Sequence, residues 1–226
     1  MAKLYFRYGT VGSAKTLNLL AVAHNYERQG RKVLVAKPAV DTRDGVRTIA
    51  SRAGLSRQAD LLIGASTRLQ PARFRGLDAV VVDEAQFLRE AQVDALRRVT
   101  LEAGVPVLCY GLRADFRGRL FEGSRRLFEV ADTIEEVKTI CADCTRKAIM
   151  NMRLVDGRPT LAGPSVQLGG DESYKPQCFG HWWRATQGPE RPSRGRRRAR
   201  TARPARGAQG SRAPTRRSPR RRARTR

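Results

Sequence analysis

The sequence predicts an α/β protein with a parallel sheet, followed by a small metal-binding segment and an arginine-rich tail. Three observations lead to this prediction: a glycine-rich loop between an apolar strand and a helix, short apolar runs separated by helical segments, and two residue pairs spaced for one metal ion. Strands that alternate with helices form parallel sheets, because each crossover helix returns the chain to the end of the sheet at which the previous strand began. We therefore expect domains at 1–140 and 141–186, and a tail at 187–226.

The glycine-rich loop is the first segment that indicates chemistry. It follows the apolar run 4–8 and opens a helical run, 17–29, that stops at Gly30. Backbone N–H groups and the positive helix end in such a loop bind phosphate, its lysine reaches the β- and γ-phosphates, and its threonine hydroxyl binds Mg²⁺. The sequence thus predicts a P-loop made of Gly9, Thr10, Val11, Gly12, Ser13, Ala14, Lys15 and Thr16.

One residue departs from the G-x-x-x-x-G-K-[ST] pattern, because Ala14 stands where the second glycine belongs. If this position requires a positive φ, alanine there costs roughly 1 kcal/mol, and if it has already entered the helix, alanine is harmless. A glycine-rich turn before a helix is often only a turn. Lys15 and Thr16, with these flanks, favour phosphate binding.

Further strands and helices follow in the alternation that a parallel sheet requires. The polar stretch 41–47 fits a loop near the nucleotide and equally fits a solvated loop with its own ion pair. The segment 111–121 mixes aromatic residues with arginine and glycine, which suits either a loop covering a flat ligand or an ordinary loop with its aromatic side chains in the core. The predicted strands are 32–36, 61–63, 79–82, 105–110 and 136–140, and the predicted helices 90–102 and 127–130.

An acidic pair, Asp83 and Glu84, directly follows the apolar run 79–82. A phosphate-loop enzyme needs a carboxylate that holds Mg²⁺ on the strand beside the loop, and we assign this role to Asp83. Glu84 points elsewhere and is a candidate general base. An acidic pair after a strand also serves to complement a helix N-terminus, but together with the upstream loop the catalytic interpretation is favoured.

Two pairs of candidate metal ligands mark a change of character at Cys141. Cys141 and Cys144 form a C-x₂-C pair, and Cys178 and His181 form a C-x₂-H pair after a spacer of 33 residues. Four such ligands suit tetrahedral Zn²⁺ with no open position, which indicates a structural site. The spacer contains strand-like runs at 148–150 and 166–168 and a turn at 156–159, which predict a small β ribbon. It has few apolar residues, so we expect its folding to depend on the metal.

Charge separates the tail from the rest of the chain. The net charge is +24, and residues 187–226 contain sixteen arginines and one glutamate, which contribute +15 of it. A segment of this composition cannot bury a core, so we expect it to be disordered. It suits non-specific binding of nucleic acid and equally suits a solvated extension that binds acids only at low salt. The absence of a long apolar run or a signal-peptide pattern predicts a cytoplasmic protein that contacts no membrane.

Together these residues resemble the type II thymidine kinases, a family with a zinc-bearing lasso domain. The resemblance covers residues 1 to 186 and rests on the order and spacing of segments 4–6, 82–87, 109–113, 115–118, 138–141, 169–170 and residue Tyr174. It implies a P-loop, RecA-like sheet domain with a small zinc-ribbon and lasso domain. It also implies transfer of the γ-phosphate of ATP to the 5′-hydroxyl of thymidine, Mg²⁺ and structural Zn²⁺ as cofactors, and a homotetramer inhibited by dTTP.

The resemblance further implies roles for single residues. Glu84 matches the general base, Gln86 joins Asp83 and the loop at ATP, and Arg43 is similar to a basic residue near the phosphates. The thymidine pocket is implied to be walled by Phe87, Leu112, Phe116 and Phe121. The lasso that reads the thymine edge through its backbone is implied to contain Ser165, Val166, Gln167, Leu168, Gly169 and Gly170, with Tyr174.

The sequence also departs from the family pattern in four places. Ala14 replaces a glycine, Val11 and Gly12 stand where the family has bulkier residues, Gln167 falls in a stretch that is usually apolar, and the tail has no counterpart. These departures bear on rate and affinity rather than on the reaction.

Two other classes of protein share parts of the pattern. The run Asp83-Glu84-Ala85-Gln86 resembles the acidic motif of ATP-driven nucleic-acid motors, but a motor needs a second ATPase-like domain for which these 226 residues leave no room. A zinc- and RNA-binding protein with an inactive loop would account for Ala14 and the basic tail. ATP turnover that depends on thymidine, on nucleic acid, or on neither distinguishes the three.

Overall fold

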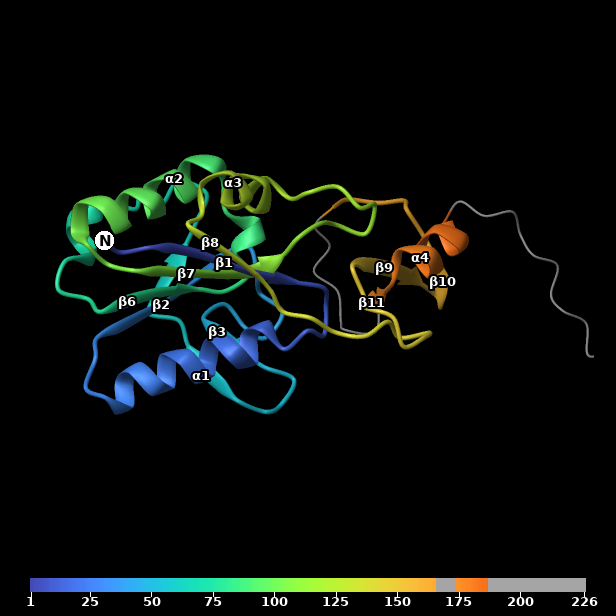
Figure 1. Ribbon diagram of the computed structural model, residues 1–226, viewed down its shortest axis with the longest axis horizontal. Coiled ribbons are helices and arrows are strands. Elements are labelled where there is room, and N and C mark those ends of the chain that lie inside the picture. The colour runs from blue at the N-terminus through green and yellow to red at the C-terminus, as the bar shows by residue number, and fades with distance from the viewer. Residues whose placement is uncertain (166–173, 187–226) are drawn as a thin grey trace, which may run out of the picture. The chain divides into compact units, whose positions relative to one another are not determined.

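The protein, as a computed structural model, is described over residues 1–165 and 174–186, which belong to one compact unit. Its centre is a six-stranded sheet in the order β5-β2-β6-β7-β1-β8, with every neighbouring pair parallel (Figure 1). The parallel α/β fold predicted from the sequence is therefore correct. The strands are β1 (Leu4–Gly9), β2 (Val33–Pro38), β5 (Leu61–Ile63), β6 (Ala79–Val82), β7 (Val107–Leu112) and β8 (Thr133–Glu136).

The two faces of the sheet are covered by different helices (Figure 1). Because side chains alternate along a strand, Val80 and Val82 of β6 pack in the core beneath α2 and α3, while Ala79 and Val81 pack beneath α1. All four of these side chains are fully buried, as expected for a central strand covered on both faces. The helices are α1 (Lys15–Arg28), α2 (Glu90–Arg98), which continues into η3 (Val99–Ala103), and α3 (Glu122–Val130).

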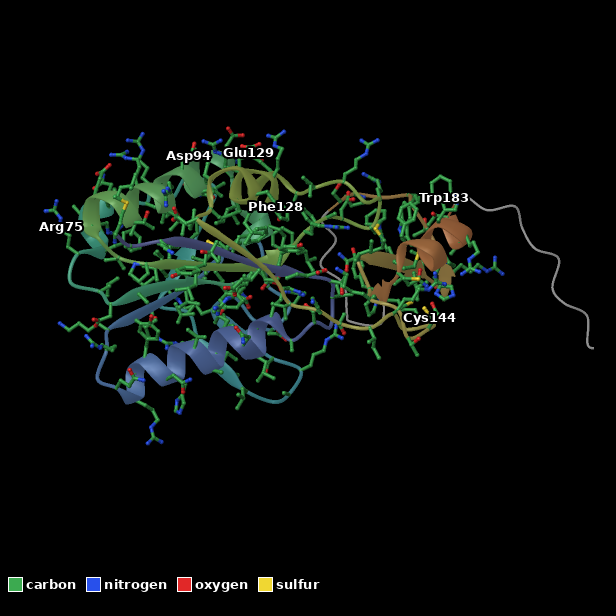
Figure 2. The ribbon with its side chains drawn as sticks, in the orientation of Figure 1. Arg75, Asp94, Phe128, Glu129, Cys144 and Trp183 are labelled. Atoms are coloured by element: carbon green, nitrogen blue, oxygen red, sulfur yellow. The ribbon has the colours of Figure 1, made fainter. Side chains whose placement is uncertain are left out.

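Phe128 of α3 contacts Phe6 and Tyr8 of β1 edge-on, at ring-centre distances of 5.1 and 5.0 Å (Figure 2).

The helix predicted at 90–102 corresponds to α2 and η3, and it ends at Gly104, whose φ of +71° is a conformation that glycine adopts without strain. Two turns, η1 (Pro71–Phe74) and η2 (Ala85–Phe87), and an antiparallel hairpin of β3 (Thr48–Ala50) and β4 (Ser56–Gln58) complete this part of the chain.

One predicted strand, 136–140, is wrong. The strand β8 instead covers Thr133–Glu136 and pairs with Tyr5–Tyr8 at the edge of the sheet. An edge strand need not be apolar: Ile134 is 44% exposed, and Glu135 pairs with Arg7 of β1 at 2.6 Å. The search for apolar runs therefore missed it. After Val137 N donates to Tyr8 O at 2.7 Å, the chain leaves the sheet.

A second, three-stranded antiparallel sheet follows, in the order β10-β9-β11. The strands β9 (Met150–Val155) and β10 (Arg158–Pro159) meet at Asp156 and Gly157, whose φ values of 48° and 72° are those of a tight hairpin turn, which confirms the predicted turn. β11 (Tyr174–Gln177) leads into α4 (Phe179–Thr186), a helix that the sequence analysis did not predict. The run 166–168, predicted as strand-like, lies outside the described residues.

The core of this ribbon is small. Its buried apolar side chains are Met150, Met152 and Trp182, which agrees with the prediction that it has few apolar residues. Trp182 Nε1 also donates to Phe116 O at 2.8 Å, which ties α4 to the loop after β7. Within the described ranges, no helix has the length and apolar character needed to cross a membrane.

Ala14 has φ 59° and ψ 26° at the residue before α1, so it lies in the left-handed region. The sequence left open whether Ala14 has a positive φ or has already entered the helix, and the structure shows the positive φ. The Cβ of an L-residue is crowded by the following carbonyl in this region, which glycine avoids.

Replacing Ala14 by glycine is expected to stabilise the protein by about 0.5–1 kcal/mol. Removing Cβ relieves about 1–2 kcal/mol of strain in the folded state. The greater conformational freedom of glycine in the unfolded chain offsets about 0.4–1 kcal/mol of this gain. Urea unfolding measures the difference. The matched control is Ala21→Gly on the exposed side of α1, which should lose about 1 kcal/mol. Equal losses in both variants would show that Ala14 is not strained.

Candidate active site and metal centre

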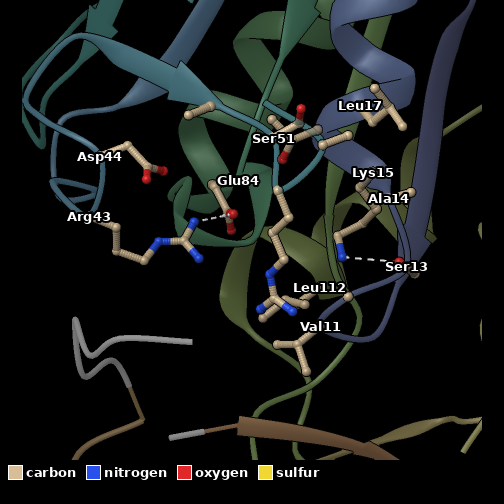
Figure 3. A pocket seen from close by; sticks show the side chains of 15 residues that line it. Val11, Ser13, Ala14, Lys15, Leu17, Arg43, Asp44, Ser51, Glu84 and Leu112 are labelled. Carbon is tan, nitrogen blue, oxygen red and sulfur yellow. Dashed lines mark hydrogen bonds and ion pairs between the residues drawn. The ribbon is translucent and has the colours of Figure 1, made fainter. Parts of the chain in front are cut away.

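A cavity of about 550 Å³ lies beside the phosphate loop, at the carboxyl ends of the parallel strands (Figure 3). Ligands of open parallel sheets bind at this edge, where loops from separate strands converge. The cavity is lined by the predicted loop, the segment after β2, the turn of the β3–β4 hairpin and the ends of β6 and β7. The lining residues are 11–17, Arg43, Asp44, 50–53, Glu84 and Leu112.

The start of the predicted loop lies beneath the cavity rather than in its lining. Gly9 ends β1, and a Cβ at this position would come within 2.4 Å of Ser13 Oγ and 2.6 Å of Val137 O, so only glycine lets the loop turn here. Thr10 is buried, and its hydroxyl has no hydrogen-bond partner in the structure. The rest of the predicted loop, from Val11 to Thr16, faces the cavity.

Lys15 folds back over the loop. Its Nζ donates to Thr10 O at 2.7 Å and to Ser13 Oγ at 3.2 Å, and the side chain is buried. Burial lowers the pKa of Lys15 to about 8, although the nearby charges of Glu84 and Asp83 oppose the shift. The ammonium group is therefore poorly compensated here, and a phosphate beside it would favour its charged form.

Thr16 and Asp83 lie together, although the strands that precede them, β1 and β6, are not neighbours in the sheet. Thr16 Oγ1 donates to Asp83 Oδ2 at 3.1 Å, and adjacent oxygen ligands of octahedral Mg²⁺ lie about 2.9 Å apart at its usual bond lengths. These two oxygens fit a magnesium ion in donor type and spacing. Burial and the charge of Glu84 raise the pKa of Asp83 to about 7.

The structure corrects one detail of the acidic pair. We predicted that it ends the strand beside the loop, but β7 lies between β1 and β6. The helix α1 starts after β1 and lies over the face of the sheet, where Leu19 and Leu20 share a core with residues of β7 and β6. Thr16 therefore reaches Asp83 from above the sheet.

Glu84 has φ 47° and ψ 38°, a left-handed conformation that is uncommon for residues other than glycine. Its two carboxylate oxygens accept hydrogen bonds from different side chains. Oε1 accepts from Arg43 Nη2 (Figure 3), and Oε2 accepts from Gln86 Nε2. Gln86 is buried, and its Oε1 accepts from Leu112 N at 2.9 Å. Gln86, predicted at ATP, thus contacts Glu84 and the end of β7 and is not among the cavity-lining residues.

The polar stretch 41–47 combines the two alternatives left open by the sequence. Arg43 Nε donates to Asp41 Oδ1 at 2.8 Å, which is the internal ion pair, and its other end reaches Glu84 in the cavity. Asp41 also pairs with Lys37 Nζ at 3.0 Å, and both are at least nine-tenths buried. Positive and negative groups thus alternate from β2 to the end of β6.

The predicted aromatic wall divides into two parts. The rings of Phe87 and Phe121 meet edge-on at 5.8 Å. Phe116 is buried beneath the guanidinium groups of Arg117 and Arg153, at 5.0 and 5.1 Å from its ring centre. Leu112, the fourth member of the predicted wall, is the one that lines the described cavity.

The predicted lasso is described only at its two ends. Ser165 Oγ accepts from Arg117 Nη1 at 3.3 Å, and Tyr174 begins β11. Val166, Gln167, Leu168, Gly169 and Gly170 lie outside the described residues.

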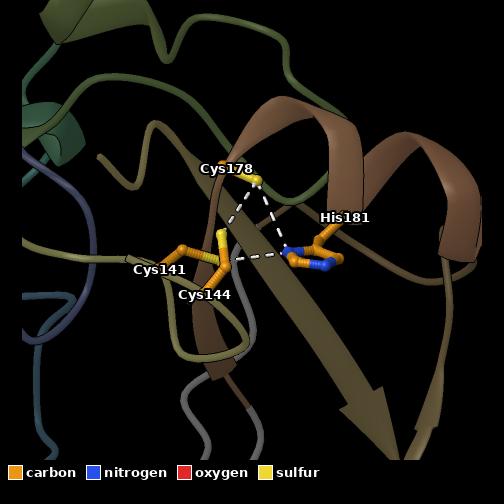
Figure 4. A group of neighbouring side chains, drawn as sticks. All are labelled: Cys141, Cys144, Cys178 and His181. Carbon is orange, nitrogen blue, oxygen red and sulfur yellow. Dashed lines mark hydrogen bonds between the residues drawn. The ribbon is translucent and has the colours of Figure 1, made fainter. Parts of the chain in front are cut away.

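The four predicted metal ligands come together (Figure 4). Cys141, Cys144, Cys178 and His181 place their ligand atoms within 4.8 Å of one another. His181 Nδ1 lies 3.4 Å from Cys141 Sγ and 3.5 Å from Cys178 Sγ, and Cys144 Sγ lies 3.9 Å from Cys178 Sγ. Zinc bonds of about 2.3 Å to sulfur and 2.0–2.1 Å to nitrogen give tetrahedral edges of about 3.5–3.8 Å. The donor set and its spacing therefore fit zinc.

Sequence reasoning missed Asn151, a buried residue of β9. Its Oδ1 accepts from Val11 N and its Nδ2 donates to Ala114 O, each at 2.9 Å. These opposite partners fix the orientation of the amide, which links the ribbon to the phosphate loop and to the loop after β7. A polar residue between two methionines is the only hint of this contact in the sequence.

Known proteins resemble this chain along most of its length. A family model described as thymidine kinase matches residues 2–182. A protein named thymidine kinase from Streptococcus gordonii is 46% identical over 190 residues, covering 81% of this chain and 97% of that protein. Its namesake from Lactococcus lactis is 45% identical over 189 residues, covering 81% of this chain and 98% of that protein.

Among solved structures, the Pif1 helicase from Candida albicans has a TM-score of 0.39 and 13% identity, covering 62% of this chain and 36% of that one. A likeness this weak carries no argument about function. The family model spans most of the chain, and the relatives match along nearly their whole length. On these grounds, the chain belongs to the thymidine kinase family.

Proposed function

We propose that this protein transfers the γ-phosphate of ATP to the 5′-hydroxyl of thymidine, giving dTMP and ADP. The observation that carries the proposal is that the phosphate loop and Glu84 line a single cavity, with the Thr16–Asp83 pair at its edge. Family membership favours this reaction over a nucleic-acid motor. We also propose, from the resemblance, a cytoplasmic homotetramer in which the zinc-bearing segment begins near Cys141.

On the ATP side, phosphoryl transfer requires positioning and neutralisation of charge. The backbone N–H groups of the loop and the N-terminus of α1 bind the phosphates, and Lys15 turns its ammonium group toward them. Thr16 and Asp83 would hold Mg²⁺, which would neutralise part of the charge of the phosphates when it is bound. The lowered pKa of Lys15 supports this role, because an anion is what the buried ammonium lacks.

On the thymidine side, Glu84 acts as general base. Each carboxylate oxygen has two lone pairs, so a substrate hydroxyl can bind beside the contacts from Arg43 and Gln86. The proton of the 5′-hydroxyl passes to Glu84 as the new oxygen–phosphorus bond forms. We assign recognition of the base to Leu112, the aromatic pair Phe87 and Phe121, Phe116, and the lasso from Ser165 to Gly170 with Tyr174.

The proposed reaction predicts that ADP release depends on thymidine. ADP is to be measured with each nucleoside in turn and with single-stranded DNA, using the full chain and a truncation after Thr186. Thymidine should stimulate both proteins to within a few-fold of each other, because the kinase pattern is complete by His181. The truncation should lose most salt-sensitive retention on nucleic acid, since it lacks sixteen arginines. Stimulation by DNA but not by thymidine would replace the kinase with a motor.

Replacing Glu84 by glutamine should lower turnover by about 10²–10⁴-fold, because the amide keeps the shape but cannot accept the proton. ATP affinity should stay within a few-fold, since the phosphates bind to the loop. Steady-state turnover and ATP titration measure the two effects. Turnover close to that of the parent protein would exclude Glu84 as the base.

Removing zinc is expected to weaken the binding of both substrates. The ribbon includes Tyr174, one of the residues proposed to recognise the base, and Asn151 joins it to Val11 N in the phosphate loop. Metal analysis of active protein should find about one zinc per chain. Chelation followed by titration with thymidine and with ATP measures the two affinities.

The matched variant Asn151→Ala tests the link itself. It should keep its zinc and lose roughly 2–10-fold in ATP affinity, the value of one hydrogen bond. Unchanged ATP binding in both the chelated protein and this variant would show that the ribbon does not support the loop.

A further inference from the structure

The turn of the β3–β4 hairpin forms one wall of the cavity through Ser51, Arg52 and Ala53. The turn is closed by its own hydrogen bonds, Ser51 N to Leu55 O at 2.8 Å and Leu55 N to Ser51 Oγ at 3.2 Å. These hydrogen bonds give the turn a defined shape. The turn and the phosphate loop line the same cavity.

The hairpin is anchored firmly to the body of the protein. Ile49 is buried in the core beneath α1, and Lys37 Nζ donates to Thr48 O at 2.9 Å. On the strand that leaves the turn, Arg57 pairs with Glu27 of α1 and with Asp60. Contacts of both strands therefore restrict the position of the residues in the turn.

Arg52 extends from this tip to the phosphate loop. A Cβ built on Gly12 would lie 3.5 Å from Arg52 Nη1, so the guanidinium lies next to the space that this glycine leaves open beside the loop. Gly12 has a φ of +71° in the stretch where phosphate-binding loops present their N–H groups. A polyphosphate bound by the loop would then have the loop on one side and Arg52 on another.

The charges around the cavity also favour an anion. Lys15, Arg43 and Arg52 line it, against Asp44 and Glu84. Three positively charged side chains thus face two carboxylates around one cavity, and this excess of positive charge favours a multiply charged anion there.

We propose that Arg52 contacts the γ-phosphate of ATP and stabilises its negative charge during transfer to thymidine. This inference rests on the proposed kinase function. In the transfer, the bond between the γ-phosphorus and the oxygen that bridges it to the β-phosphorus breaks. A bond from the thymidine 5′-oxygen to the γ-phosphorus forms, and the hydroxyl proton passes to Glu84. Arg52 gains and loses no proton, because guanidinium remains charged throughout.

Arginine is the side chain that this role needs. Its planar fork of N–H donors matches two phosphate oxygens at once, whereas the lysine ammonium acts as a point charge. In phosphate-loop enzymes, an arginine supplied by the same chain or by a partner raises turnover by about 10³–10⁵-fold. The hairpin would supply such an arginine within one chain, which would also make a second ATPase-like domain unnecessary.

The test compares Arg52→Gln and Arg52→Lys with Arg57→Gln, a control on the same hairpin that does not line the cavity. Turnover, the KM values for both substrates and ATP affinity without thymidine are measured for each, with thermal unfolding as a check on folding. We expect Arg52→Gln to lower turnover about 10³-fold or more while the KM for thymidine stays within a few-fold. Arg52→Lys should recover only part of the loss, and Arg57→Gln, which weakens an anchor of the hairpin without removing a cavity-lining group, should lower turnover far less than Arg52→Gln.

Chemical rescue separates contact with phosphate from a structural role. Millimolar guanidinium added to Arg52→Ala should restore part of its turnover, because the free ion can occupy the vacated place. Turnover of Arg52→Gln close to the parent value, or an equal fall in Arg57→Gln without rescue of Arg52→Ala, would overturn the proposal. Either result would leave thymidine-dependent ADP release by the parent intact, so it would not be mistaken for failure of the kinase function.

Discussion

Two adjacent buried carboxylates, Asp83 and Glu84, set the constraint on which the rest of the site depends. Removing a carboxylate from water costs several kcal/mol unless charges and hydrogen bonds replace the lost hydration. Glu84 is compensated by Arg43 and Gln86, and Arg43 is held in turn by Asp41. Asp83 accepts hydrogen bonds from the backbone of Glu84 and from the Thr16 hydroxyl, and Lys15 is a more distant positive charge, yet its pKa rises to about 7. The difference between them matches their proposed roles, because the charge that Asp83 lacks is the one that Mg²⁺ supplies.

The parts of the structure that could be predicted from sequence are those with a local signature. The glycine-rich loop, the apolar strands and the four candidate metal ligands are recognised by residue types at fixed spacing. Each spacing reflects a local geometry, such as a turn before a helix or a strand covered on both faces. Strand β6 shows this best: four apolar residues identify a strand covered on both faces, and all four are buried.

The parts that could not be predicted depend on residues distant in sequence. Strand β8 is polar and is a strand only because β1 lies beside it. Asn151 has no distinctive neighbours, and its role comes from Val11, which precedes it by 140 residues. Arg52 belongs to a short hairpin whose strands were too brief and too polar to be recognised, and nothing in its local sequence places it at the cavity. The position of β7 between β1 and β6 is likewise a property of the sheet order alone.

The Asn151 contact also changes how the two halves of the chain should be regarded. From the sequence, the zinc-bearing segment and the phosphate loop belong to separate domains, which would let each substrate bind independently. In the structure, one buried amide joins the central strand of the ribbon to the loop backbone, and Trp182 joins α4 to the loop after β7. Hydrogen bonds of buried amides are weak individually but strongly directional. The ribbon is therefore positioned to fix the orientation of the Val11 peptide, so a metal held by the four candidate ligands would take part in shaping the loop proposed to bind the phosphates.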